Sequence, residues 1–200
     1  MRNHEFQQQR PAWHGFAGRL AGLFGIRFYD MYYAHRALSS STDSPDLPIA
    51  AQVRLATAKD LDAIVSRQGT SMRAGFTHCQ DIGSTCYVGL EGASIAGYLW
   101  VNRQVVEMAG MHLARLPPGH AFSHGAYVFP EYRNRKFYQA LRATVCNEMR
   151  NAGCHFMACL VDKAQAPSIH VLSREGMNFQ HAAVLKLPGF RPIVMCNALK

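Results

Sequence analysis

The chain has 200 residues and a mass of 22.3 kDa, a length that suits one domain with an appendage. Apolar residues make up 48% of it and charged residues 17%, which excludes an intrinsically disordered chain. A run of about 18 uncharged apolar residues is missing from the sequence. A conventional membrane-spanning helix is therefore excluded as well.

The charge is strongly positive, with 21 Lys and Arg against 13 Asp and Glu, a net +8 and an isoelectric point near 9.4. A basic domain attracts anions such as nucleic acid, anionic lipid, an acidic carrier protein or a polyphosphate cofactor. The sequence contains no zinc finger, no aromatic RNA-binding box and no long Lys/Arg run. We therefore expect no nucleic-acid partner.

The six cysteines include no CxxC pair, and the ten histidines include no HExxH motif. These spacings fit neither a metal site nor a disulfide framework. We expect free thiols, no metal and a reducing, cytoplasmic location.

The N-terminal segment 12–38 predicts an amphipathic helix. Its apolar side chains recur at intervals of three and four, at Trp13, Phe16, Leu20, Leu23, Phe24, Phe28, Met31 and Tyr32. Its four glycines each weaken a helix by roughly 1 kcal/mol relative to alanine, so the helix needs a surface to lie on. Three alternatives remain open: packing on the protein's own domain, a frayed terminus, or peripheral contact with an anionic membrane through residues 12–38.

The Ser/Pro/Asp-rich stretch 39–51 predicts a linker. We therefore expect a helical appendage over residues 1–38 and one folded domain over residues 52–200. In the first half of that domain we expect strands over 53–55, 86–90, 94–101, 104–114 and 121–129. Thr57 and Asp60 have the spacing of a helix cap after the first strand, and Glu91-Gly92 predicts a turn.

The second half predicts a helix over 137–151 closed by Gly153, a strand over 155–161, a helix over 168–175 ended by Gly176, and a strand over 182–187. This order of elements predicts an α/β fold with a mixed sheet flanked by helices. It does not fit a doubly wound sheet.

The block YVFPEYRNRKFY, residues 127–138, joins a strand end to a long helix through a basic turn. A helix N-terminus offers unpaired N–H groups and a partial positive charge, to which Arg133, Arg135 and Lys136 add. Such a turn suits a pyrophosphate. Taken alone, the block is equally typical of a basic turn exposed to solvent.

Over residues 52–190 the chain resembles the GCN5-related N-acetyltransferase (GNAT) family. The matching features are Val128-Phe129-Pro130 ahead of Arg133, the long helix, the next strand, Gln165-Ala166 before a short helix, and Gly176 with Phe179 after it. The opening VRLATAKDLDAI and the hairpin YVGLEGASIAGYLWV also resemble the first elements of the family. The resemblance implies an acyl-CoA N-acyltransferase-like fold, with a mostly antiparallel central sheet.

The resemblance also implies acetyl-CoA as cosubstrate, held where two central strands part, and direct attack of an amine on the thioester. The backbone of Ala126, Tyr127 and Val128 would then hold the pantetheine arm. The residues that would hold the pyrophosphate are Arg133, Asn134, Arg135, Lys136, Phe137 and Tyr138, and Gln165 lies where the family has an asparagine.

The chain departs from the family pattern at several positions. Asn134, Lys136 and Tyr138 replace glycines; an asparagine tolerates positive φ well, whereas Tyr138 adds bulk. The tyrosine that often protonates the leaving thiolate falls at Leu172. We therefore predict that the adjacent Ser173 acts as the acid through a water.

Three residues are candidates for the general base: His124, Glu107 and Glu131. We predict His124, because an imidazole with its ordinary pKa of about 6.5 suits proton removal at neutral pH. Strand alternation places His124 and Ala126 on one face and Ser123 and Tyr127 on the other.

The acceptor is expected to be a small-molecule or protein amine. By the resemblance, its pocket is formed by residues 66–80 and 189–192, where few carboxylates occur, so a polycation is disfavoured. Two alternatives stay open: acyl transfer from an acyl carrier protein, as in autoinducer synthases, and a non-catalytic CoA-binding or membrane-docked module.

Overall fold

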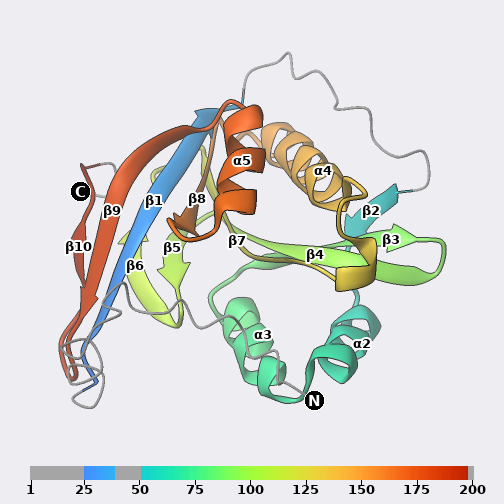
Figure 1. Ribbon diagram of the computed structural model, residues 1–200, viewed down its shortest axis with the longest axis horizontal. Helices are drawn as coiled ribbons and strands as arrows, with labels where there is room; N and C mark the ends of the chain where they lie inside the picture. The colour runs from blue at the N-terminus through green and yellow to red at the C-terminus, as the bar shows by residue number, and fades with distance from the viewer. Residues whose placement is uncertain (1–24, 39–50, 198–200) are drawn as a thin grey trace.

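The computed structural model describes residues 25–38 and 51–197. In chain order the elements are β1 (Arg27–Ala37), β2 (Ala51–Leu55), α2 (Ala58–Gln68), α3 (Ser71–Asp81), β3 (Thr85–Glu91), β4 (Ser94–Asn102), β5 (Val105–Met108), β6 (Met111–Arg115), β7 (His120–Val128), the 3₁₀ turn η1 (Pro130–Tyr132), α4 (Phe137–Asn151), β8 (Phe156–Asp162), α5 (Ala166–Arg174), β9 (Asn178–Lys186) and β10 (Ile193–Met195) (Figure 1).

Eight strands form one sheet in the order β10-β9-β1-β8-β7-β4-β3-β2. Among the described strands, β7 and β8 run parallel to each other and every other neighbouring pair is antiparallel. Strands β5 and β6 form a separate hairpin. The predicted mixed, mostly antiparallel α/β fold is thus confirmed.

The predicted N-terminal helix is wrong over residues 27–37, because these residues form β1 in the interior of the sheet. The strand pairs with β8 from Met31↔Asp162 to Ala37↔Phe156, and with β9 on its other edge. The domain boundary predicted at residue 52 is therefore wrong as well, since the sheet includes β1. The rest of the predicted helix, residues 12–24, and the linker 39–50 lie outside the described residues.

The burial of β1 explains why a strand forms there. Tyr29, Met31 and Tyr33 are buried in alternation, which is the period of a strand and not of a helix. Aromatic side chains favour the pleated surface of a sheet, and this segment is rich in them.

Two other expectations needed correction. The strand predicted over 104–114 is the β5–β6 hairpin, which turns at Ala109 and Gly110, both with positive φ. Helix α3 was not predicted.

The predicted cap of α2 is present: the Asp60 N–H donates to Thr57 Oγ1, and the Thr57 N–H donates to the Asp60 carboxylate.

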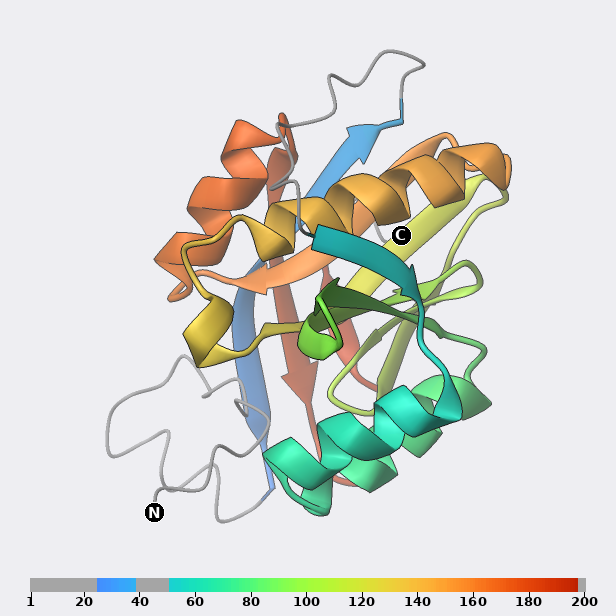
Figure 2. The same cartoon turned by 90° about the vertical axis from the view of Figure 1, so that its right-hand side faces the viewer.

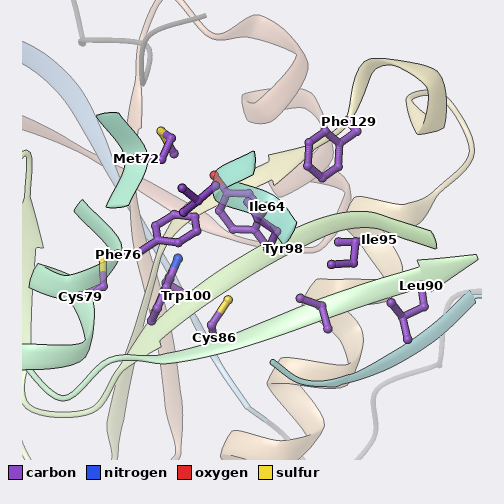
Figure 3. Packing of buried hydrophobic residues seen from close by; sticks show 12 residues of the cluster. Ile64, Met72, Phe76, Cys79, Cys86, Leu90, Ile95, Tyr98, Trp100 and Phe129 are labelled. Atoms are coloured by element: carbon purple, nitrogen blue, oxygen red, sulfur yellow. The ribbon is translucent and has the colours of Figure 1, made fainter. Parts of the chain in front are cut away.

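Helices cover both faces of the sheet, with α4 and α5 on one side and α2 and α3 on the other (Figure 2). The core between α2, α3 and strands β3 and β4 contains Phe76, whose ring contacts both Tyr98 and Trp100 (Figure 3). Their neighbours on the two strands, Tyr87 and Leu99, face the opposite way and pack with α4.

Past β7 the sheet has a different cover on each face. The β5–β6 hairpin packs over Phe122, which lies on the α3 side, whereas α5 packs over Cys159 through Leu172. All six cysteines are free and buried, as predicted. In the described ranges, the helices are too short or too polar to cross a membrane.

Candidate active site

Strands β7 and β8 pair at one end and part at the other. Their parallel register runs from His120↔Phe156 to Ser123↔Cys159 and stops there. Beyond this last pair β7 stays with β4, while β8 stays with β1 (Figure 1). The two strands therefore open a V whose apex is the Ser123–Cys159 pair.

A β-bulge shapes the β7 side of the V. The register of β7 on β4 shifts between Tyr98 and Trp100, where Gly125 has a φ of 57°. The extra residue reverses the expected alternation, so Tyr127 lies on the same face as His124. Tyr127 stacks on Tyr98, with ring centroids 5.9 Å apart, and the prediction that it shares a face with Ser123 is wrong.

The backbone of Val128 faces the V. The next residue, Phe129, donates its N–H to Ala96 O on the β4 side at 2.9 Å, and successive residues of a strand point their polar groups to opposite edges. The C=O of Val128 accepts from Arg133 Nε at 3.2 Å. Its N–H is left as a donor directed into the gap, as expected for a residue that holds an acyl or pantetheine group.

The turn between η1 and α4, residues 133–136, is the one that the sequence predicts to be a phosphate turn. Asn134 and Lys136 take φ values of 61° and 62°, although neither is a glycine. Lys136 is the N-cap of α4 and makes no side-chain capping bond, so the first N–H groups of the helix stay available. Their direction and the helix dipole favour an anion beside this turn.

The side chains of the turn differ in their availability. Arg133 and Lys136 are exposed, and Arg133 extends along Tyr127. Arg135 instead forms an ion pair with Glu91 at the end of β3. Phe137 is buried, 2% exposed, so only its backbone N–H faces the turn.

Tyr138 is half-buried, and its ring lies beside Arg142, one helical turn later on α4. The Arg142 guanidinium carbon lies 5.9 Å from the Tyr138 ring centroid. Arg142 is 2% exposed; its Nη1 donates to Ser123 Oγ at 3.1 Å and its Nε to Glu175 Oε2 at 2.6 Å. Tyr138, Arg142 and Glu175 thus form a polar cluster at the apex of the V.

Burial and charge set the ionisation of this cluster. Burial raises the pKa of Tyr138 to about 12, although Arg142 beside it acts in the opposite direction. Burial alone would lower the pKa of Arg142, but Tyr138 and Glu175 outweigh it and the pKa lies above its ordinary value. At neutral pH Tyr138 is therefore a neutral O–H donor beside a permanent cation.

His124 lies on the opposite face of β7, one residue beyond the apex. Its Nε2 is 2.9 Å from Ser84 Oγ, and Asn102 Nδ2 donates to the same hydroxyl at 3.0 Å. Burial, with His78 nearby, lowers the pKa of His124 from 6.5 to about 4. The imidazole is therefore uncharged at neutral pH, but the ordinary pKa for which His124 was chosen as the base is wrong, and its lowered pKa makes it a weaker base.

The two other candidate bases lie in different surroundings. Glu107 is buried on β5, with its Oε1 3.6 Å from His78 Nε2. Burial raises the pKa of Glu107, although the N–H of Gly110 and the imidazole of His78 both act to lower it. Glu131 is exposed and forms an ion pair with Arg67. Glu131 is therefore at the surface and paired with a cation.

The structure separates the predicted residues on α5. Gln165 is the N-cap residue of the helix, and its Oε1 accepts from Ser168 Oγ at 3.3 Å. Leu172 is buried against Cys159, whereas the adjacent Ser173 is exposed. The role of Ser173 as an acid stays a prediction, and its exposed position adds no support to it.

Sequence reasoning missed Arg142 and Glu175. The signal was present, because Arg142 is a charged residue four positions after Tyr138 on a helix whose other inward residues are apolar. It missed the partners of His124 as well, since Ser84 and Asn102 are 40 and 22 residues away along the chain.

Comparison with known proteins gives a family match and a set of similar folds. The family model described as "Acetyltransferase (GNAT) family" matches residues 57–177, more than half of the chain. No curated protein matches the sequence significantly.

Three solved structures illustrate the likeness of fold. A Drosophila protein superposes with a TM-score of 0.60 at 14% identity, over 87% of this chain and 58% of its own. A GCN5-related N-acetyltransferase from Kribbella flavida gives 0.53 at 12% identity, over 88% and 65%. AAC(6')-Iy in complex with a CoA-S-monomethyl-acetylneamine bisubstrate analog gives 0.50 at 17%, over 63% and 89%. The present chain spans less than two thirds of the first two.

Proposed function

This chain belongs to the acetyltransferase (GNAT) family, and on that premise we propose that it transfers an acetyl group from acetyl-CoA to an amine. One observation carries the proposal: a turn with left-handed Asn134 and Lys136 leads into the open N-terminus of α4, beside the V between β7 and β8. An anion site and a gap for an extended arm therefore adjoin each other.

The residues present fit acetyl-CoA. The N–H groups at the start of α4, with the exposed Arg133 and Lys136, would hold the diphosphate, and the N–H of Val128 would face the thioester. The ring of Tyr138 lies against Arg142. AAC(6')-Iy, which has a similar fold, is in complex with a CoA-containing analog, and this supports a CoA cosubstrate for the present chain.

Bound acetyl-CoA supplies an acyl group activated as a thioester. The N–H of Val128 stabilises negative charge on the carbonyl oxygen as the amine nitrogen bonds to the carbon. His124, uncharged at neutral pH, accepts the proton that the nitrogen loses, and Ser84 holds the ring in place.

Loss of the thiol requires a proton on sulfur. Tyr138 supplies a hydroxyl from the polar cluster beside the apex, and Arg142 stabilises the tyrosinate that remains after Tyr138 donates its proton. Solvent then takes the proton from His124 and returns one to Tyr138, so the protein ends the cycle unchanged. Ser173 is the alternative donor, acting through a water.

Transfer from an acyl carrier protein is the second candidate. The ion pair between Arg135 and Glu91 favours it, because it reduces the positive charge that the turn offers a free diphosphate. A carrier would bring its arm through the same V and meet the basic turn with its own acidic surface.

Isothermal titration with acetyl-CoA tests the proposal. We expect micromolar binding, and a loss of at least several-fold in affinity for Arg133→Glu combined with Lys136→Glu, because two cationic contacts to phosphate are reversed. Arg103→Glu, at an exposed arginine bonded to Ala152 O, is the matched control and should bind as the parent does. An unchanged affinity in the double variant would refute the binding of the diphosphate at this turn. No binding by the parent chain would favour the carrier protein.

A further inference from the structure

Two adjoining hollows lie on the face of the sheet that carries His124. The first, about 490 Å³, lies between the end of α3 and the β5–β6 hairpin. The second, about 750 Å³, lies between that hairpin and residues 186–192. Gly110 and His112 line both, so the two hollows are neighbours on one continuous surface.

The hollows carry charge of opposite sign. The first is lined by two carboxyl groups, Glu107 and Asp81. The second is lined by Arg115, Lys186 and Arg191, and the described residues around it include no carboxylate. A ligand that spans both would meet acids at one end and bases at the other.

Glu107 is the unusual member of the first hollow, because it is a carboxyl group only 7% exposed. Its Oε1 accepts the N–H of Gly110, which ties the hairpin turn. His78 Nε2 lies 3.6 Å away from the same carboxyl, beyond hydrogen-bond distance, and has no hydrogen-bond partner within the described residues. A desolvated carboxyl in such a wall gains stability when a cation approaches it.

The acidic hollow adjoins the base that the proposed reaction uses. His124 contacts Ser84. The Asn102 amide donates both to Ser84 Oγ and to the backbone oxygen of Ile82, and so links the two residues. Ile82 and Gly83 line the first hollow. The wall of the acidic hollow is therefore linked to His124 through Ser84 and Asn102. None of these residues lines the basic hollow.

From these charges we propose that the acceptor is a small amine that also carries an anionic group, with its ammonium beside Glu107 and its anion beside Arg115 and Arg191. The inference rests on the proposed function. It narrows the acceptor class to amino acids and similar compounds, and it excludes simple amines and polyamines as preferred acceptors.

Calorimetry on the full chain tests the pairing of charges with ε-aminocaproate, n-hexylamine and caproate, which share one carbon skeleton. Ethanolamine and O-phosphoethanolamine form a second pair, in which the added anion is a phosphate. Comparison with the first series shows whether the basic hollow prefers a phosphate or a carboxylate. We expect the bifunctional compounds to bind about tenfold or more tightly than their monofunctional partners, the effect of one added charged hydrogen bond.

Variants assign each end. Glu107→Gln keeps an oxygen for the Gly110 N–H and should weaken n-hexylamine and ε-aminocaproate but not caproate. Asp81→Asn, at an exposed carboxyl, should act in the same direction without involving the turn. Arg115→Gln with Arg191→Gln should weaken caproate and ε-aminocaproate but not n-hexylamine, and Arg174→Gln on α5 should change none of them.

The outcomes separate this inference from the proposed function. Equal affinity for all probes, no binding of either bifunctional compound at millimolar concentration, or variants without this pattern would overturn the inference. Transfer to n-hexylamine as fast as to ε-aminocaproate would overturn it while leaving the acetyltransferase intact. The expected binding pattern without any acetyl transfer would leave the charge-paired site standing and remove the proposed reaction.

Discussion

Met31 on β1 provides the sharpest test of the fold, because the structure places it in the core although the sequence suggested an appendage. Its side chain is fully buried, 0% exposed, among Tyr29, Met108, Met111 and Val184. Truncating a buried methionine to alanine removes its transfer free energy and leaves a cavity, which costs about 2–5 kcal/mol. We expect Met31→Ala to lower the free energy of unfolding by that amount.

Urea denaturation measured by fluorescence is a suitable assay, because Trp100 is 1% exposed and lies in a different part of the core. Arg27→Ala, at the exposed start of the same strand, is the control and should change stability by less than about 0.5 kcal/mol. Removal of residues 1–45 should yield an unfolded chain, since β8 and β9 lose their shared partner. A cost below about 0.5 kcal/mol for Met31→Ala, or a folded truncated domain, would refute the central position of β1.

Three further outcomes follow from single residues. Glu175→Gln leaves the buried Arg142 without its counter-charge and should cost about 3–5 kcal/mol in urea denaturation; a cost under about 1 kcal/mol would contradict the buried pair. His124 has a folded pKa of about 4 against an ordinary 6.5, so the unfolded chain binds more protons between these values. Stability should therefore fall as pH drops through that window, and His124→Gln should flatten this slope; identical slopes would contradict the buried neutral imidazole. Lys136→Gly relieves a φ of 62° and should raise the free energy of unfolding by up to about 1 kcal/mol, with a slightly higher melting temperature. A lower melting temperature would show instead that the Lys136 side chain supports the turn.

Local signals made part of the fold predictable. The Thr57–Asp60 cap and the boundaries of α4 depend on neighbours within one or two helical turns, and both were predicted correctly. Helix α3 lacks such signals: Thr70 makes no side-chain cap bond, and Gly75 lies within the helix. Its existence depends on Phe76 and its packing on the sheet, which no local pattern reveals.

The identity of β1 could not be predicted for a different reason. Its partners lie far away in the chain, as Met31 opposite Asp162 shows, and the pairing energy comes from those contacts. The apolar positions of residues 27–37 fit a helical period as well as a strand period. Within the site, the face on which Tyr127 lies could not be predicted either. The bulge at Gly125 inserts one residue into β7 and places Tyr127 on the other face of the sheet.

The phosphate turn illustrates how distant packing maintains a local strain. Left-handed backbone at Asn134 and Lys136 costs about 1–3 kcal/mol at each residue, so the turn needs support from its ends. Phe129 before the turn and Phe137 after it are both nearly fully buried, and Tyr132 packs edge-on against Phe137 at 5.6 Å. These aromatic anchors fix both ends of the turn and hold the left-handed residues between them. The N–H groups that face the proposed diphosphate are thus held in place by apolar side chains that would never touch it.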